Sequence, residues 1–299
     1  MIRDTIKKSK MLKSIYLKFR ERRMMILCKI SPVLATNALY KRIFKHPPDL
    51  KHPKTFNEKI LWLKLNTYKD NELITQCVDK YRVREYIENC GYGNILDKLI
   101  GVYNRPEDIE WSNLPKQFVL KLNTGSGYNI VCKNKDNLDE NKAKKKLKKW
   151  MKEDYSLKYA DIQYKNVRPK IICEEYLADD IVDYKFFCFN GVPEFLYISK
   201  GLGDKDYLQM AFYTCDWKEI DIERYGYHRL KEKIVKPQNY DEMLEISKRL
   251  SKDFPFVRVD LYNINGKIYF SELTFVPTAG VMKVTPEEKL IEWGNLLKI

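Results

Sequence analysis

The segment from Val257 to Phe275, VRVDLYNINGKIYFSELTF, most strongly constrains how this chain can fold. Apolar and polar residues alternate on both sides of Asn265-Gly266, a pattern that predicts two antiparallel strands joined by a tight turn. A three-residue loop ending at Gly266 pairs Asp260 with Phe270, whereas a two-residue loop pairs Asp260 with Ser271. We expect the three-residue loop, because it keeps the charged residues of both strands on one face.

One face of this hairpin is apolar and the other is charged. The apolar face is expected to pack in the core and consists of Val257, Val259, Leu261 and Leu273. The charged face consists of Arg258, Asp260, Glu272 and Thr274, with Arg258 opposite Glu272. Two carboxylates on adjacent strands repel each other unless a cation lies between them. That cation is either Arg258, in a structural salt bridge, or Mg²⁺, which takes oxygen ligands and bridges carboxylates to nucleotide phosphates. In the second case Arg258 is left free to bind a phosphoryl oxygen.

A second candidate site lies in QFVLKLNTGSGYNIVCK, residues 117 to 133. Lys121 interrupts an otherwise apolar strand and must reach a partner, because an isolated buried ammonium is strongly disfavoured. The following loop, residues 123 to 127, offers backbone N–H groups that suit phosphate oxygens. An ordinary hairpin turn explains the same loop equally simply. The chain contains neither a P-loop nor a G-x-G-x-x-G dinucleotide motif.

Acidic and basic residues also close two other predicted strands. IICEEYLADD, residues 171 to 180, ends in carboxylates that form either a solvated edge or acceptors for the amino group and ribose of a nucleotide. Asp183 and Lys185 alternate onto one face of DYKFFCF, the first strand of a hairpin that turns at Asn190-Gly191. Lys200 ends the partner strand of that hairpin.

The order of elements predicts an α+β fold in four regions. Residues 1 to 45 form a basic helical arm, and residues 46 to 110 hold two helices. The first of these helices starts at TFNEKILWLKLNTY, where Thr55 and Glu58 form a capping box, and the second spans ELITQCVDKYRVREYIENCG. Strands begin near residue 111, and the boundary between the two sheet-containing regions, 111 to 178 and 179 to 299, follows IICEEYL.

Charge and cysteine content limit the possible partners and compartments. The formal net charge of +14 favours polyanionic partners, and much of the excess lies in residues 6 to 23 and 141 to 150. The first basic segment also carries an apolar stripe, so it either lies on an anionic membrane or packs on its own protein; the second is explained by a solvated helix face. Scattered cysteines without a C-x-x-C pair, and no apolar run long enough to span a membrane, indicate a cytoplasmic protein. No motif predicts sequence-specific binding to nucleic acid.

Taken in order, VDKYR, FVLKLNTGSG, IICEEYL, DYKFFCFNG and the final hairpin with VPTAG resemble the ATP-grasp superfamily. The chain looks closest to the TupA-like branch, which is associated with polysaccharide and teichuronopeptide gene clusters. The resemblance covers roughly residues 45 to 285, and the order and spacing of the motifs carry it rather than any single motif. It implies two α+β subdomains that grip ATP, preceded by a helical region.

The resemblance assigns roles to residues of the nucleotide site. Lys80 resembles a phosphate-contacting lysine, and Lys121 the lysine that bridges adenine and the α-phosphate. The glycine-rich loop of the lid corresponds to Thr124, Gly125, Ser126 and Gly127. The adenine hinge corresponds to Glu174, Glu175, Tyr176 and Leu177. Either Asp180 or Asp183 would lie near the ribose, and Lys185 and Lys200 match places of cationic phosphate ligands.

The resemblance also implies a reaction and its metal. Arg258 resembles the arginine that stabilises a tetrahedral intermediate, and the magnesium ligands correspond to Asp260, Glu272 and Thr274. Thr274 replaces the usual asparagine, and Thr124 replaces a histidine common in this branch, so metal geometry or activity could differ. ATP and two Mg²⁺ ions would serve a carboxylate–amine ligase that forms an acyl phosphate.

The expected substrates are an amino acid or other amine and a uronic acid of a capsular or other surface polysaccharide, or its precursor. Two other classes stay open. One is a glycosyl- or phosphotransferase of polysaccharide synthesis, and the other is a non-catalytic protein that binds anions or a membrane.

Overall fold

A computed structural model describes residues 10–201 and 208–299 of the chain. In chain order the helices are α2 (Lys10–Ile30), α3 (Pro32–Phe44), α4 (Phe56–Leu65), α5 (Glu72–Val78), α6 (Val83–Asn89), α7 (Glu140–Trp150), α8 (Tyr155–Lys158), α9 (Tyr240–Ser251) and α10 (Lys289–Leu296). The strands are β1 (Leu99–Tyr103), β2 (Phe118–Leu122), β3 (Asn129–Cys132), β4 (Ile171–Glu175), β5 (Asp183–Phe189), β6 (Val192–Lys200), β7 (Gln209–Thr214), β8 (Glu219–Ile220), β9 (Glu223–Arg224), β10 (His228–Arg229), β11 (Phe256–Ile264), β12 (Lys267–Thr274) and β13 (Val284–Thr285). Short 3₁₀ turns that matter below are η5 (Ile162–Tyr164) and η6 (Pro277–Gly280).

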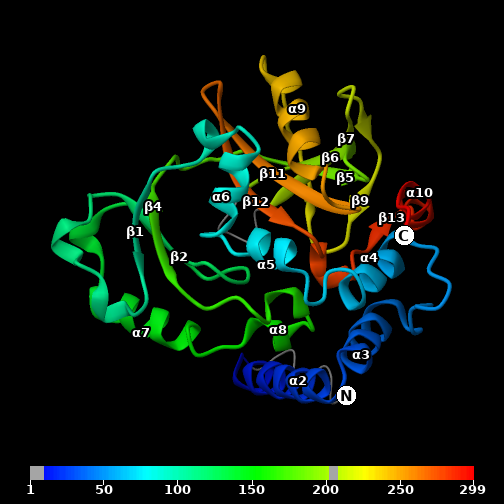
Figure 1. Ribbon diagram of the computed structural model, residues 1–299, viewed down its shortest axis with the longest axis horizontal. Coiled ribbons are helices and arrows are strands. Elements are labelled where there is room, and N and C mark those ends of the chain that lie inside the picture. The colour runs from blue at the N-terminus through cyan, green and yellow to red at the C-terminus, as the bar shows by residue number, and fades with distance from the viewer. Residues whose placement is uncertain (1–9, 202–207) are drawn as a thin grey trace.

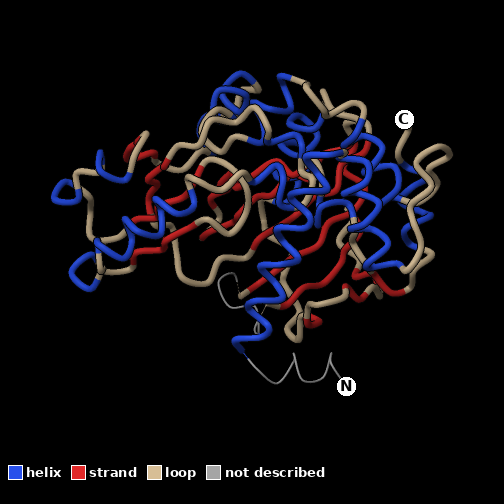
Figure 2. The backbone as a smooth tube through the Cα atoms, turned by 90° about the horizontal axis from the view of Figure 1, so that it is seen from below, coloured by secondary structure: helices blue, strands red, loops and turns tan. Residues whose placement is uncertain are grey.

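Two antiparallel sheets form the framework, as the α+β prediction requires. The smaller sheet has the order β1-β4-β2-β3, and α7 packs on it through Ala143, Leu147 and Trp150. The larger sheet has the order β10-β7-β6-β5-β11-β12, with β8 beside β7. Figure 1 shows the smaller sheet at the left and the larger sheet at the right, and Figure 2 shows the same separation from below. The four predicted region boundaries stay a prediction.

Both faces of the larger sheet are covered by helices. On one face α9 packs beside Phe186, with the Tyr240 ring centroid 6.0 Å from that of Phe186. On the other face Trp293 of α10 stacks on Phe195 at 4.4 Å, and Phe56 of α4 lies 6.1 Å from Phe187. Lys185 has the same parity as Phe187 along β5, so it projects from the face that α4 and α10 cover.

The helical predictions hold for α4 and fail for the segment after it. The capping box is confirmed, because the Thr55 hydroxyl accepts from the Glu58 N–H at 3.3 Å and Glu58 Oε2 accepts from the Thr55 N–H at 3.0 Å. The helix expected over ELITQCVDKYRVREYIENCG is instead two helices, α5 and α6. The Asp79 carboxylate breaks it by accepting from the backbone N–H groups of Tyr81 and Arg82 at 2.8 and 3.2 Å, an aspartate turn that competes with the helix.

The last hairpin keeps the predicted faces with a different register. Ile264 pairs with Lys267, so the turn has two residues, Asn265 and Gly266, both in the left-handed region at φ 52° and 80°. The expected three-residue loop is therefore wrong. Ser271 forms a β-bulge between Phe270 and Glu272 that shifts the register by one, so Asp260 faces Glu272 and Arg258 faces Thr274. The bulge returns both carboxylates to the same face.

The basic N-terminal segment is a packed helix with a partly exposed apolar side. Met24 and Cys28 of α2 are buried against α3 and α8, and Glu21 pairs with Lys158 at 3.0 Å. Residues 1–9, part of the predicted arm, lie outside the described residues. A search of the described residues found no helix with the length and apolarity needed to span a membrane.

Candidate active site

A cavity of about 820 Å³ brings together residues from both sheets and from α3. Its wall includes most of the side chains that the sequence singled out. Those residues are Lys80, Lys121, Gly125, Ser126, Gly127, Asp183, Lys185, Arg258, Glu272 and Thr274. The glycine-rich loop and the last hairpin are far apart in sequence and line the same cavity, which makes it the candidate active site.

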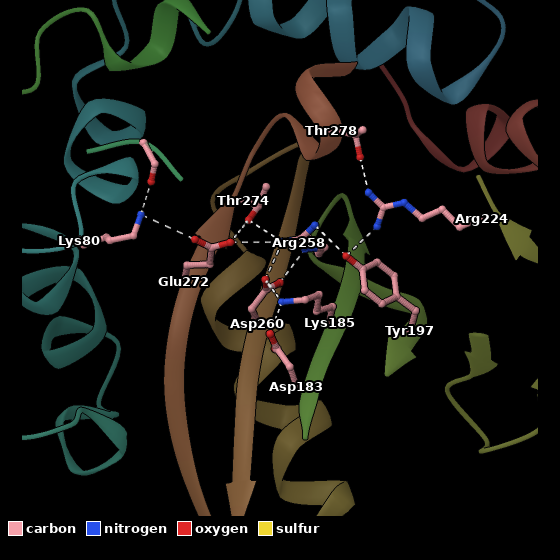
Figure 3. A network of polar contacts seen from close by, with 11 residues as sticks. Lys80, Asp183, Lys185, Tyr197, Arg224, Arg258, Asp260, Glu272, Thr274 and Thr278 are labelled. Atoms are coloured by element: carbon pink, nitrogen blue, oxygen red, sulfur yellow. Dashed lines mark hydrogen bonds and ion pairs between the residues drawn. The ribbon is translucent and has the colours of Figure 1, made fainter. Parts of the chain in front are cut away.

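Asp260 forms the buried centre of the charged network (Figure 3). Its side chain is fully buried, and its two oxygens accept from Arg258 Nε at 2.7 Å and Arg258 Nη2 at 2.6 Å. Lys185 Nζ donates to the same carboxylate at 2.7 Å, because β5 lies beside β11 and places Lys185 opposite Asp260. Arg258 is thus bound bidentately by Asp260 here, the arrangement of a structural salt bridge.

Glu272 lies nearer the cavity than Asp260. Its Oε1 accepts from the Thr274 hydroxyl at 3.1 Å and from Arg258 Nη2 at 3.3 Å, whereas Oε2 lies 3.8 Å from Lys80 Nζ. Burial alone would raise the pKa of Glu272, but the charges of Lys80 and Arg258 outweigh it and lower the pKa to about 2. Glu272 is therefore ionised near neutral pH, and Oε2 faces its cation beyond hydrogen-bond distance.

Asp183 adds a third carboxylate to this network. It pairs with Lys185 through Oδ2, whereas its buried Oδ1 has no hydrogen-bond partner among the described residues. Burial raises the pKa of Asp183 to about 6, and Asp260 nearby acts in the same direction. A buried acceptor that lines a cavity and lacks a donor suits a hydroxyl group or a cation of a ligand.

Lys80 ties the glycine-rich loop to the hairpin. Its Nζ donates to the Gly125 carbonyl at 2.7 Å, and its backbone N–H donates to the Asn123 carbonyl at 2.8 Å. Gly125 and Gly127 adopt positive φ angles of 73° and 79°, which other residues rarely adopt. The loop is thus both a hairpin turn between β2 and β3 and part of the cavity wall. Thr124, by contrast, is buried behind the wall.

Lys121, a charged residue within a strand, forms an ion pair with Glu174. Its Nζ lies 2.5 Å from Glu174 Oε2, because β2 and β4 are neighbours in the smaller sheet. Burial would lower the pKa of Lys121, but the Glu174 carboxylate outweighs it and raises the pKa. Lys121 is therefore a permanent cation in the cavity wall, with the acidic end of β4 behind it.

Other predicted residues lie outside this wall. Glu175 accepts from the Lys98 N–H at 2.9 Å, and Tyr176 donates to Asp179 at 2.6 Å. Lys200 pairs with Glu232. The remaining predicted hinge and ribose residues that do not line the cavity are Leu177 and Asp180.

A family comparison identifies the family of the chain. The family model described as TupA-like ATPgrasp matches residues 58–298, which is most of the chain. The chain belongs to the TupA-like ATP-grasp family. This confirms the family and the fold expected from the sequence, and the two sheets with a cavity between them are the ATP-grasp framework of this chain.

Two solved structures to which the chain is similar are ligases by name. The chain is similar to D-alanine–D-alanine ligase from Bacillus anthracis, with 18% identity, 69% of this chain and 58% of that chain covered, and a TM-score of 0.42. It is similar to L-amino acid ligase from Bacillus licheniformis, with 12% identity, 83% and 49% covered, and a TM-score of 0.44. This chain spans about half to three fifths of their length. Comparison with curated proteins gave no match.

The donor set of this TupA-like ATP-grasp site fits magnesium if the nucleotide supplies further ligands. Within the described residues, no group of three or more His, Cys, Asp or Glu side chains is arranged to hold a metal. Glu272 offers a hard oxygen ligand at Oε2, to which no group of the described residues donates a hydrogen bond, whereas both oxygens of Asp260 already accept from Arg258 or Lys185. Mg²⁺ is commonly held by one or two carboxylates together with phosphate and water. The Thr274 hydroxyl, engaged with Arg258 and Glu272, is the weakest of the three proposed ligands.

Sequence reasoning missed three residues of the network, Tyr197, Arg224 and Thr278. Arg224 Nη1 and Arg258 Nη1 both donate to the Tyr197 hydroxyl, at 3.1 and 3.2 Å. Arg224 Nη2 donates to Thr278 Oγ1 at 2.6 Å. Tyr197 shares a strand face with Phe195, a signal that alternation could have provided. Arg224 lies in a strand of two residues, which gives no periodic signal.

Proposed function

We propose that this TupA-like ATP-grasp protein is an ATP-dependent carboxylate–amine ligase that works through an acyl phosphate. The observation that carries the proposal is the meeting, in one cavity, of Lys121, the glycine-rich loop and the hairpin that bears Asp260 and Glu272. Phosphoryl transfer uses cations, backbone N–H groups and carboxylates, and here Glu272 lines the cavity while Asp260 lies buried beside it.

The reaction follows from the charges in the wall. A carboxylate oxygen of one substrate attacks the γ-phosphorus of ATP and ADP leaves; the nitrogen of an amine then attacks the acyl carbon, phosphate leaves, and the nitrogen loses a proton. Lys121 and Lys185 offset the charge that develops on the transferred group, and Arg258 stabilises the tetrahedral intermediate. Two Mg²⁺ ions, held through Asp260, Glu272 and Thr274, would supply further charge neutralisation.

The nucleotide would lie between the two sheets. Adenine would meet the end of β4, at Glu174, Glu175, Tyr176 and Leu177, beside Lys121. The unpartnered Oδ1 of Asp183 favours this residue over Asp180 as the ribose contact, because a ribose hydroxyl supplies the missing donor. The phosphates would meet Lys80, Lys185 and the loop from Thr124 to Gly127, with Lys200 further along β6.

For the substrates we propose an amino acid and a uronic acid of a surface polysaccharide or its precursor. The support is the polysaccharide association of the TupA-like branch, the net charge of +14, and a cavity wall rich in tyrosine. Aromatic rings bind sugars through their apolar faces, and a basic protein attracts acidic saccharides. The tyrosines in the wall are Tyr128, Tyr155, Tyr159, Tyr164, Tyr197, Tyr225, Tyr227 and Tyr262.

Hydroxylamine trapping tests the reaction class. Incubation of the protein with ATP, Mg²⁺, hydroxylamine and a panel of uronic and amino acids should yield a hydroxamate and ADP, because hydroxylamine captures an acyl phosphate. The Glu272→Gln variant is the matched control and should yield neither product. A glycosyl- or phosphotransferase gives no hydroxamate, so transfer products without hydroxamate would contradict the proposal.

We further propose that α2 rests on the anionic inner face of the membrane, which would make the protein cytoplasmic and peripheral. Ile15, Tyr16 and Phe19 are 53, 48 and 67% exposed, which is unusual for large apolar side chains that gather on one helix. Exposed Lys18 and Arg22 alternate with them, and this mixture of apolar and basic residues suits anionic lipid.

Vesicle sedimentation tests this contact. The full chain should bind vesicles that contain phosphatidylglycerol and not vesicles of phosphatidylcholine alone. Phe19→Ser should weaken binding, whereas Val235→Ser, a change at an even more exposed apolar residue outside α2, should not. Equal binding by the two variants would refute a role for α2.

A further inference from the structure

We propose that Arg224, oriented by Tyr197 and Thr278, forms an anion site that binds a carboxylate of a substrate. The inference rests on the proposed ligase function, because both proposed substrates carry a carboxylate. It adds a ligand site to the cavity wall that Tyr197 and Arg258 connect to the Asp260 and Glu272 pair (Figure 3).

Three contacts fix the Arg224 guanidinium. Nη1 donates to the Tyr197 hydroxyl at 3.1 Å, Nη2 donates to Thr278 Oγ1 at 2.6 Å, and the guanidinium carbon lies 4.2 Å from the centroid of the Tyr227 ring. The pairing of β9 with β13 holds the backbone. Arg224 is only 8% exposed, and its exposed part lines the cavity.

The charge of Arg224 lacks a counterion in the described part of the chain. Four cationic side chains are buried there: Lys64, Lys185, Arg224 and Arg258. Lys185 and Arg258 pair with Asp260, and Lys64, which does not line the cavity, lies near the buried carboxyl of Asp161. Arg224 forms an ion pair with no Asp or Glu of the residues described. Since arginine stays protonated in proteins, this buried charge is compensated by no carboxylate among the residues described.

Tyrosine contacts compensate this charge only in part. The Tyr227 face attracts the guanidinium, but such an interaction is weaker than an ion pair with a desolvated carboxylate. The neutral acceptors, Tyr197 and Thr278, satisfy donors without supplying negative charge. A ligand anion that reaches Arg224 from the cavity would supply it.

The hydrogen bonds of Tyr197 also indicate that an anion binds beside Arg224. Its oxygen accepts from both Arg224 and Arg258, so its hydroxyl hydrogen is left for a third acceptor. An anion beside Arg224 would accept that hydrogen. The same hydroxyl links the anion site to Arg258, the residue proposed to act at the reacting carbon.

The backbone around Thr278 is held in an unfavourable conformation. Thr278 and Ala279 both have φ 54°, and Gly280 follows at φ 77°. Consecutive left-handed residues other than glycine cost free energy and persist where surrounding structure holds them, often at binding sites. Here the conformation presents the Thr278 hydroxyl to Arg224.

The ligand class follows from the shape of the donors. A guanidinium fork matches the two oxygens of a carboxylate, and the tyrosines around it suit a sugar ring or another compact organic acid. The carboxylate could belong to the uronic acid or to the amino acid. The experiment therefore has one arm for each source.

Binding is measured by calorimetry on the full chain with the ATP analogue AMP-PNP and Mg²⁺ present. D-glucuronate is compared with D-glucose, and glycine with glycinamide, so each acid has a neutral counterpart. Wild-type protein should bind at least one acid more tightly than its counterpart. Arg224→Met should weaken that binding by about tenfold to a hundredfold, the loss expected for charged hydrogen bonds. Arg224→Lys should weaken it as well, since lysine lacks the fork.

Arg229→Met is the matched control, because Arg229 is exposed and pairs with Glu219 and Asp221. If Arg224→Met does not fold, Thr278→Ala at an exposed residue replaces it and should weaken the same acid. The proposal is overturned if neither acid binds, if the neutral counterparts bind equally well, or if the Arg224 and Arg229 variants bind alike. Failure of AMP-PNP to bind wild-type protein would refute the ligase proposal. Acid binding that depends on Arg224 would still support the anion site in that case.

Discussion

Replacement of Asp260 by asparagine tests whether the buried network depends on one negative charge. The change keeps the size of the side chain and removes the charge that both Arg258 and Lys185 contact. Lys185 keeps Asp183 as a partner, whereas Arg258 keeps only the more distant Glu272 at 3.3 Å. Asp260→Asn therefore leaves Arg258 as the less compensated of the two cations, with only 7% of its surface exposed.

The structure sets the size of the effect. Removal of one partner from a buried ion pair costs about 3 to 5 kcal/mol of unfolding free energy, because the remaining charge stays desolvated. Asp260 is fully buried and Arg258 is 7% exposed, so solvent screening does not reduce this figure. We expect a loss of about 4 kcal/mol. At roughly 2 to 4 °C per kcal/mol for large domains, Tm should fall by about 10 °C.

A double-mutant cycle in urea separates the network from other effects of the substitution. Lys185→Met in the Asp260→Asn background removes the second cation. The remaining Asp183, whose pKa burial already raises to about 6, can then take up a proton and become neutral. The double variant should be more stable than the sum of the single losses by about 1 to 3 kcal/mol.

Lys236→Met provides the control, because Lys236 pairs with Asp241 on the surface. Its effect should add to that of Asp260→Asn within about 0.5 kcal/mol. Two results would refute the reasoning: a Tm for Asp260→Asn that equals the wild-type value, or additivity between Asp260→Asn and Lys185→Met.

Three other substitutions probe neighbouring features. Glu272→Gln should abolish hydroxamate formation and lower the free energy of unfolding by about 1 kcal/mol or less, because Glu272 is about a third exposed. Since the pKa of Glu272 is lowered to about 2, this difference in unfolding free energy should be complete above pH 4.5 and vanish as the pH falls toward 2. Urea titrations across the acid range would show this. Gly125→Ala should weaken AMP-PNP binding in calorimetry, because φ is 73° and the new methyl would lie 2.5 Å from the Tyr155 ring; equal affinity would exclude a role for this loop. Trp293→Ala should cost about 3 to 5 kcal/mol of unfolding free energy in urea, given its stacking on Phe195; a loss below 1 kcal/mol would contradict the core assignment.

Local sequence patterns predicted the elements that are governed by neighbours in the chain. Thr55 and Glu58 lie three residues apart, and this spacing alone determines their reciprocal hydrogen bonds. Asn190-Gly191 likewise encodes its turn, since both residues adopt positive φ, and Phe189 pairs with Val192 as expected. Alternation in the last hairpin correctly placed its charged residues on one face.

Features that arise from tertiary contacts could not be predicted from the sequence. The bulge at Ser271 is not marked by glycine or proline, so the sequence pattern offered the two-residue turn and the shared charged face only in different registers. The helix breaks at Asp79 because the Asp79 carboxylate forms a local turn. This break lets the Lys80 N–H bond to the carbonyl of Asn123, a residue distant in sequence, and that contact could not be predicted from the local pattern. No sequence pattern marks Arg224. Its candidate role depends on Tyr197 and Thr278, which contact it only in the folded protein.

The placement of the N-terminal helices suggests how reaction and substrate choice are divided in this chain. All proposed nucleotide and metal residues lie within the segment 58–298 that the family model matches. Leu39 and Ile43 of α3 lie before that segment and nevertheless line the same cavity. Leu39 and Ile43 contribute apolar surface, and Arg42 of the same helix adds a cation that is not among the residues proposed to bind ATP. Changes in α3 can therefore alter which acceptor fits while the residues proposed to bind ATP stay in place.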